Sequence, residues 1–164
     1  GRCILSASCE TVIKVDLIAW KNKTEAAKRK IRSSATSYVQ SQVTKVLKDA
    51  LRVSPQWSGT FAYNWTVEYT GYQATYDPRF KVEPYWSIRG SEKKAGDLQA
   101  IKANLSDQLE VIKRLKWNHK VRLVNHAPVA ELIETGQVKL RPENKIPGNL
   151  GVISYLKQKY RIVI

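Results

Sequence analysis

Apolar residues recur at helical spacing along residues 19 to 54, the longest patterned stretch of the chain. They follow at steps of four and then continue at threes and fours: Ala27, Ile31, Ala35, Val39, Val43, Val46, Leu47, Ala50 and Leu51. This spacing predicts one long helix whose apolar stripe winds slowly around it and wraps along a partner element. Thr24 is the predicted N-cap. Pro55 predicts the end of the helix, because the residue before a proline is disfavoured in the α region.

A period of two replaces the helical period after this proline. The aromatic and apolar positions that alternate with smaller or polar ones are Phe61, Tyr63, Trp65, Val67 and Tyr69. The alternation predicts a strand with an aromatic face. Gly59 precedes the strand and is expected to adopt a backbone angle that other residues avoid. Gly71 predicts a turn into a short return strand over residues 72 to 76, within an elaborated loop that spans residues 70 to 92.

The second half of the chain predicts shorter elements. A second helix is expected over residues 97 to 116, where apolar positions recur at threes and fours. Three basic residues are expected in its last turn, where cations suit the negative end of the helix dipole: Lys113, Arg114 and Lys116. Residues 120 to 125 predict a second strand. A short helix follows, with Pro128 at its first position and Gly136 just past its end. Residues 150 to 164 predict a short helix that runs into an apolar end.

These elements predict an α+β fold. A long N-terminal helix and a second helix pack on a small, mostly antiparallel sheet, and a short C-terminal helix follows. The length of 164 residues predicts a single domain over residues 1–164, with residues 1 to 20 as an N-terminal arm or short strand. The chain has no run of about 18 apolar residues, so neither a transmembrane helix nor a membrane partner is expected.

The charge balance narrows the class of partner. Lys and Arg number 28 against 14 Asp and Glu, which gives a net charge of +14. Such an excess attracts polyanions, of which nucleic acid is the commonest. The positive charge is spread along the chain, which suits a protein close to DNA better than one that reads a DNA sequence. Lys28, Arg29 and Arg32 are candidates to face DNA, with a solvated helix end as the alternative.

Catalytic or metal chemistry finds little support in the sequence. The chain has two histidines, His119 and His126, and two cysteines, Cys3 and Cys9. Their spacing fits neither a zinc site nor a nucleophile activated by an adjacent base. The cysteines are interpreted as free thiols of a reducing compartment. We therefore expect no enzymatic activity, no metal and no cofactor.

The segment SPQWSGTFAYNWTVE, residues 54 to 68, resembles part of the neck and tail-completion proteins of tailed bacteriophages. In that family a long helix ends in a proline turn, a glycine follows, and a strand begins near an Asn-Trp pair. The matching residues here are Pro55, Gly59, Asn64 and Trp65. A later strand of the family ends in Asn, and the short helix after it starts at Ala-Pro and ends in Glu-x-Gly. The matching residues are Asn125, Pro128, Glu134 and Gly136.

The resemblance implies a structural role in the virion. The chain would be a subunit of a homo-oligomeric ring, a hexamer or dodecamer, at the head-to-tail junction, assembled in the host cytoplasm. Its implied partners are the connector or head-closure protein, the tail terminator or tail tube protein, and packaged DNA that is touched without sequence specificity. The motif residues would act as scaffold, with Trp65 packing the sheet on the helices. The alternative is a basic, non-specific nucleic-acid-binding protein.

Overall fold

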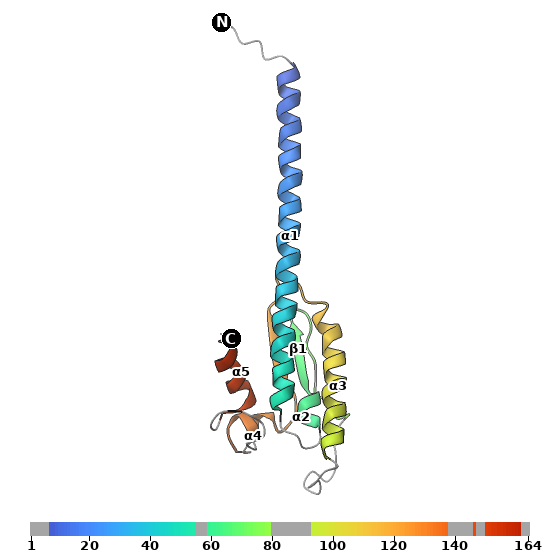
Figure 1. The fold of residues 1–164 in the computed structure, drawn as a ribbon, viewed down its shortest axis with the longest axis vertical. Helices are drawn as coiled ribbons and strands as arrows, with labels where there is room; N and C mark the ends of the chain where they lie inside the picture. The colour runs from blue at the N-terminus through green and yellow to red at the C-terminus, as the bar shows by residue number, and fades with distance from the viewer. Residues whose placement is uncertain (1–6, 55–58, 80–92, 138–145, 147–149, 162–164) are drawn as a thin grey trace.

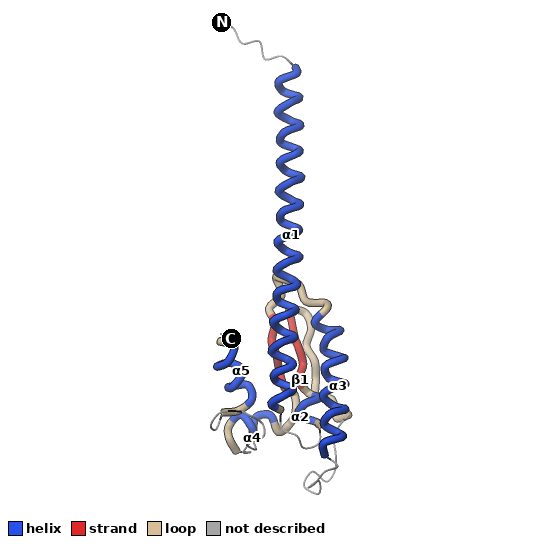
Figure 2. Tube along the Cα trace, viewed as in Figure 1, coloured by secondary structure: helices blue, strands red, loops and turns tan. Residues whose placement is uncertain are grey.

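The computed structural model describes residues 7–54, 59–79, 93–137, 146 and 150–161, with side chains from residue 18 in the first helix and from residue 98 in the third. These residues form a helix-rich α+β fold, which confirms the predicted fold class. Within them, a two-stranded antiparallel sheet lies among five helices (Figure 1, Figure 2). The elements are α1 (Ala7–Val53), α2 (Thr60–Tyr63), β1 (Trp65–Tyr69), α3 (Lys93–Ile112), β2 (Val121–Asn125), α4 (Ala130–Glu134) and α5 (Val152–Tyr160).

The first helix, α1, is longer than the sequence pattern predicted. It runs unbroken from Ala7 to Val53, a length of 47 residues. The strand expected within residues 1 to 20 is therefore wrong from Ala7 onward, and residues 1 to 6 lie outside the described part. The physical reason is that neither Gly nor Pro occurs between residues 2 and 54, so nothing in the sequence interrupts the helix.

Of the two ends predicted for α1, the structure confirms the C-terminal one and not the N-terminal one. Thr24 is not an N-cap, because it lies inside the helix and its hydroxyl donates to the Trp20 carbonyl at 2.9 Å. The helix ends at Val53, as Pro55 predicted, although Pro55 itself lies outside the described residues. Ser54 closes the last turn, since its hydroxyl donates to the Ala50 carbonyl at 2.7 Å.

The strand predicted from Phe61 begins later than expected. Residues 60 to 63 form a single helical turn, α2, and β1 starts at Trp65. Gly59 permits this turn with a φ of 78°, the left-handed angle predicted for it, and its carbonyl accepts the Tyr63 N–H at 2.8 Å. Phe61 and Trp65 are four residues apart, so the same spacing satisfies both a strand and a helical turn.

The sheet pairs β1 with β2 in antiparallel register. The paired residues are Trp65 with Asn125, Thr66 with Val124, Val67 with Leu123, Glu68 with Arg122, and Tyr69 with Val121. The return strand predicted over residues 72 to 76 does not form, and Tyr72 makes only an isolated bridge to Tyr69. The Ala74 N–H donates to the Glu68 carboxylate at 3.2 Å, and the Asp77 N–H just after this segment donates to Asn64 Oδ1 at 2.8 Å, so these two groups bond to side chains and not to a strand. The rest of the loop, residues 80 to 92, lies outside the described residues.

The remaining helices differ from prediction mainly at their ends. Because α3 ends at Ile112, the basic residues expected in its last turn, Lys113, Arg114 and Lys116, follow the helix instead. The short helix α4 begins at Ala130, two residues after Pro128, so Pro128 is not its first position. Gly136 lies just past its end with a φ of 74°, as predicted.

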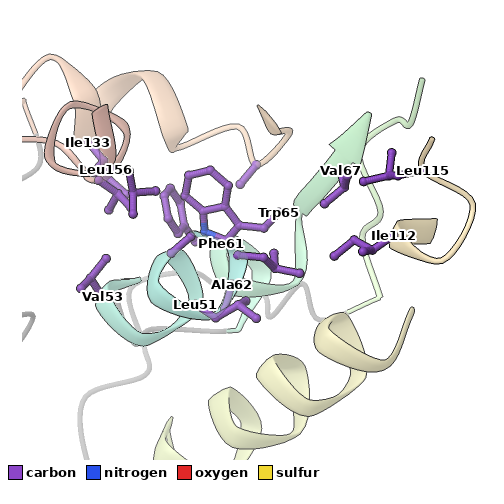
Figure 3. Close-up of a cluster of buried hydrophobic side chains, with 14 residues drawn as sticks. Leu51, Val53, Phe61, Ala62, Trp65, Val67, Ile112, Leu115, Ile133 and Leu156 are labelled. Atoms are coloured by element: carbon purple, nitrogen blue, oxygen red, sulfur yellow. The ribbon is translucent and has the colours of Figure 1, made fainter. Parts of the chain in front are cut away.

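Buried apolar side chains from α1, α2, β1, α3, α4 and α5 form the core, and Trp65 lies within it (Figure 3). The Trp65 side chain is fully buried, as the sequence predicted, and its Nε1–H donates to Ser54 Oγ at 2.8 Å. The Phe61 ring meets the Trp65 ring edge to face, with centroids 5.7 Å apart. Trp65 thus ties the first residue of the sheet to the end of α1.

Candidate interaction surface

The N-terminal part of α1 extends well beyond the rest of the fold (Figure 1). Its first cation–π and hydrogen-bond contacts with the body come late. The Arg32 guanidinium lies 6.0 Å from the centroid of the Trp117 ring, Thr36 Oγ1 accepts the Trp117 N–H at 3.1 Å, and Gln40 Nε2 donates to the Lys113 and Leu115 carbonyls. Residues 18 to 31 precede these contacts and span roughly 20 Å of helix. We call this stretch of α1 the projecting segment.

Large apolar side chains of α1 are exposed on and just after the projecting segment. Trp20 and Ile31 are each 68% exposed, and Tyr38 is 66% exposed. Because these residues are 11 and 7 positions apart, they lie on one face of the helix. We call the seam that they mark the exposed stripe, in which Thr24 is half-buried and the other members are exposed: Trp20, Thr24, Ala27, Ile31, Ser34 and Tyr38. Large exposed apolar side chains aligned on one helix face make this stripe a candidate interaction surface.

The exposed stripe differs from the core-facing stripe of the same helix. Val39 and Val43 pack against the core, whereas Ile31, which the sequence pattern assigned to the same stripe, points to solvent. Among the described residues, the hydrogen bonds between α1 and the rest of the protein begin at Thr36. The apolar positions predicted to face the core begin earlier, at Ala27, so the first of them have no core to cover. α1 therefore carries apolar positions that its own core covers and others that it leaves exposed.

The three residues predicted to face DNA lie on the projecting segment and at its end. Lys28, Arg29 and Arg32 are exposed and fall within an arc of about 100° on the helix. Glu25 lies within this arc and pairs with Lys28 at 3.0 Å. The hydrogen bond and charge of Lys28, with the charges of Arg32 and Arg29, lower the pKa of Glu25. The arc is basic, with one carboxylate at its centre.

The motif residues that the structure describes act as connectors within the scaffold. Asn64 fixes the segment after β1, because its Nδ2 donates to the Thr60 and Asp77 carbonyls and its Oδ1 accepts the Asp77 N–H at 2.8 Å. Asn125 ends β2, where its Nδ2 donates to the Phe61 carbonyl and its Oδ1 accepts the Ala127 N–H, both at 2.9 Å. Both asparagines thus hold backbone turns that have no ladder partner.

Glu134 has a role that the sequence did not reveal. Its carboxylate accepts the Ile153 N–H at 2.6 Å and the Ser154 N–H at 3.2 Å, so it caps the N-terminus of α5 from α4. Gly151 is required for this approach, because a Cβ there would lie 2.4 Å from Glu134 Oε2 and 2.7 Å from Glu134 Cα. The Glu-x-Gly end of α4 therefore positions the next helix.

A carboxylate that sequence reasoning missed holds the other end of α5. Asp49 of α1 is buried and pairs with Arg52 on its own helix and with Lys159 of α5. The Tyr160 hydroxyl also donates to Asp49, at 3.2 Å. Burial raises the pKa of Asp49, but the hydrogen bonds from Lys159 and Arg52 outweigh this effect, and the pKa falls below its ordinary value. Local spacing signals only the Arg52 pair, because Lys159 and Tyr160 lie at least 110 positions from Asp49 in sequence.

The buried Glu68 carboxylate contacts three polar groups near the sheet. Its carboxylate accepts from Arg122 at 3.1 Å, lies 2.9 Å from His126 Nε2 and accepts the Ala74 N–H at 3.2 Å. The cluster ties β1 to β2 and to the segment after β1. These three partners all belong to this chain, so the Glu68 carboxylate braces the fold.

A groove of about 690 Å³ lies between α1 and α3. Its walls carry hydroxyl and lysine side chains of α1, and Leu109, Glu110 and Lys113 at the α3 side. Glu110 and Lys113 pair with each other across the helix end and are both well exposed. Among the described residues, no group of three or more His, Cys, Asp or Glu side chains is placed to hold a metal ion.

Within the same residues, the helices lack the combination of length and apolar character needed to cross a membrane. Comparison of the chain with models of protein families, with curated proteins and with solved structures gave no match. The projecting segment of α1 is thus the feature on which a functional argument rests.

Proposed function

We propose that this chain is a structural virion protein of the neck of a tailed bacteriophage. As a subunit of a hexameric or dodecameric ring around the DNA channel, it joins head to tail and completes the tail. The observation that carries the proposal is the projecting segment, whose exposed Trp20 and Ile31 belong to a protein that works inside an assembly. A helix that extends beyond its own core leaves apolar side chains in water, which a partner in an assembly would cover.

The scaffold around the sheet supports this proposal. Gly59, Asn64 and Asn125 form turns, and Glu134 and Gly136 set the junction between the C-terminal helices. These are the residues that carry the resemblance to neck and tail-completion proteins, and each one acts on the backbone. In this proposal these residues maintain the shape of the subunit and take part in no reaction.

The partners follow from the proposed place in the virion. The connector or head-closure protein lies on one side of the ring, and the tail terminator or tail tube protein on the other. Lys28, Arg29 and Arg32 contact the packaged DNA without reading its sequence, which accords with the net charge of +14. No cofactor, metal or enzymatic step is part of this function.

Quantitative mass spectrometry of gradient-purified virions tests the proposal. We expect the chain at roughly six or twelve copies per particle, the orders of closed rings. Negative-stain microscopy of the purified chain should show rings of the same order. Intact particles that lack the chain, with the chain free in the lysate, would overturn the virion role.

A basic, non-specific nucleic-acid-binding protein is the second candidate, favoured by the lysines and arginines exposed along residues 21 to 32. A monomer whose affinity for duplex DNA falls steeply with salt would support it. Replacing Lys28, Arg29 and Arg32 with Ala would then weaken DNA binding and reduce its salt dependence. In the neck role, the same variant still forms rings.

A further inference from the structure

We propose that the exposed stripe of α1 binds an acidic amphipathic helix of another protein, with which it forms a short coiled coil. The inference names a partner for the projecting segment and so deepens the proposed assembly role on which it rests. The partner is defined by its chemistry: apolar residues at heptad spacing, flanked by Glu or Asp.

The spacing of the exposed stripe is that of a coiled-coil seam. Trp20, Thr24, Ala27, Ile31, Ser34 and Tyr38 follow one another at alternating steps of four and three, the a and d positions of a heptad. The seam is narrow, because Thr24 and Ser34 are polar and Ala27 is small. A narrow seam with a few large side chains suits the knobs and holes of one partner helix better than it suits a membrane surface.

Lysines flank the seam on both sides. Taking Trp20 and Ala27 as d positions, Lys21 and Lys28 fall at e, and Lys23 and Lys30 fall at g. All four lysines are exposed, and Lys28, which also pairs with Glu25, borders the seam and belongs to the basic arc proposed to face DNA. Residues at e and g form salt bridges with the partner helix and so determine which partner binds. Four lysines at these positions therefore favour a partner with acidic e and g positions.

The same lysines argue against a second copy of this chain on the stripe. In a parallel pair, the g lysines of one helix meet the e lysines of the other, and in an antiparallel pair e meets e and g meets g. Either arrangement places Lys opposite Lys, which is destabilising. The ring contacts of the proposed assembly therefore involve other surfaces.

Nucleic acid fits the stripe less well than an acidic helix. The lysines border Trp20 and Ile31, which are each 68% exposed and offer nothing to a phosphate backbone. DNA contact uses the cations alone, whereas an acidic amphipathic helix uses both the seam and its borders. DNA is accordingly an outcome that the test distinguishes.

α1 already contacts another helix of this chain further along. Lys45 lies one heptad after Tyr38, and its Nζ lies 5.9 Å from the centroid of the Tyr160 ring of α5. The next turn carries Asp49, which pairs with Lys159 of α5. α5 thus packs against α1 near its C-terminal end, whereas the N-terminal part of α1 stands clear of the other elements (Figure 1).

Fluorescence anisotropy with labelled synthetic helices tests the proposal on the purified full chain. The probe is a peptide of about 28 residues with Ile and Leu at a and d and Glu at e and g. The comparison probes are the same peptide with Lys at e and g, polyglutamate of equal length, short duplex DNA and anionic vesicles. We expect the acidic helix to bind at least about tenfold more tightly than the basic helix or polyglutamate.

Two variants locate the binding. The charge reversal Lys21→Glu, Lys23→Glu, Lys28→Glu and Lys30→Glu should exchange the preference, so that the basic helix binds and the acidic one does not. The double variant Trp20→Ala and Ile31→Ala should lower affinity for the acidic helix at least about tenfold. Circular dichroism checks that both variants keep their helix content.

A matched control reverses the same number of charges elsewhere. The control replaces four exposed lysines with Glu: Lys102, Lys116, Lys120 and Lys157. It should keep the preference for the acidic helix. Equal losses in the control and the stripe variant, or equal binding of polyglutamate, would reduce the effect to net charge and overturn the proposal.

Three further results also count against it. Tighter binding of DNA or vesicles than of the acidic helix would assign the segment to those partners. A dimer that Trp20→Ala abolishes would assign the stripe to a second copy. The virion measurement is independent of these outcomes. If the chain is present in virions but binds no acidic peptide, this partner alone is rejected. If the chain binds the peptide but is absent from virions, the neck role alone is rejected.

Discussion

The Glu134 carboxylate accepts a hydrogen bond from the Ile153 backbone N–H at 2.6 Å. The two residues belong to α4 and α5, and they lie 19 positions apart in sequence. The bond satisfies one of the free N–H groups that begin every helix, and it places a negative charge at the positive end of the helix dipole. Through this one side chain, the orientation of the C-terminal helix depends on the end of α4.

We predict that Glu134→Ala destabilises the protein by about 1–2 kcal/mol, the range of a lost N-cap. The free energy of unfolding from urea denaturation measures the effect. Glu131→Ala is the matched control, because Glu131 is exposed on the same short helix and its loss should stay within about 0.5 kcal/mol. Equal effects of the two substitutions would show that the cap contributes nothing beyond helix propensity.

Truncation of Trp65 should be the most damaging single change at the core. We predict that Trp65→Ala lowers the free energy of unfolding by about 3–5 kcal/mol, because it opens a cavity and leaves Ser54 Oγ without its indole donor. Trp20→Ala is the control, since Trp20 is 68% exposed and its loss should be close to neutral. A melting temperature for Trp65→Ala equal to that of the wild type would remove Trp65 from the core.

The sequence was informative where a local signal decides the structure. The helix end before Pro55, the second strand and the left-handed glycines Gly59 and Gly136 all follow from the preferences of single residues. It was misleading where two signals coincide. The spacing from Phe61 to Trp65 fits a strand and a helical turn equally. The N–H groups of Ala74 and Asp77 after β1 bond to side chains that no period reveals.

The candidate surface was only partly visible in the sequence. Lys28, Arg29 and Arg32 stand out as a basic run, but the exposed stripe shares Ile31 with the core-facing pattern and was hidden by it. The point at which the body of the protein stops covering α1 depends on contacts with residues 113 to 117, more than 70 positions away. Such contacts are tertiary, so a single helix pattern does not contain them.

We predict that Asp49 makes the stability of the fold sensitive to acid. Its pKa is lowered in the folded state, so its contribution is present above the unfolded pKa and is lost as pH falls through the folded pKa, that is, below about 4. Asp49→Asn should cost about 1.5–3 kcal/mol at neutral pH, the range for hydrogen bonds to charged groups. The difference from the wild type should shrink as the pH falls below 4.

Urea denaturation at a series of pH values measures this difference. Glu110→Gln is the control, because Glu110 pairs with Lys113 at the surface, where both side chains are more than 60% exposed. Exposed pairs contribute little, so this variant should follow the wild type at every pH. A constant difference between Asp49→Asn and the wild type across the acid range would show that the Asp49 charge does not hold α5.

Tyr63 should give the protein a second pH limit, on the alkaline side. Burial and the hydrogen bond that its hydroxyl donates to Asp107 at 2.8 Å raise the pKa of Tyr63 to about 12. The neutral phenol is therefore favoured in the folded state, while in the unfolded chain it ionises near pH 10. Its contribution is complete below pH 10 and is lost as pH rises from 10 to 12, about 2–3 kcal/mol in all. Tyr63→Phe should remove this alkaline loss, which denaturation between pH 9 and 12 measures.

Tyr38→Phe is the control, because Tyr38 is 66% exposed and its substitution should leave the pH profile of stability unchanged. If Tyr63→Phe loses stability above pH 10 as steeply as the wild type, the phenol of Tyr63 is not held neutral by the fold.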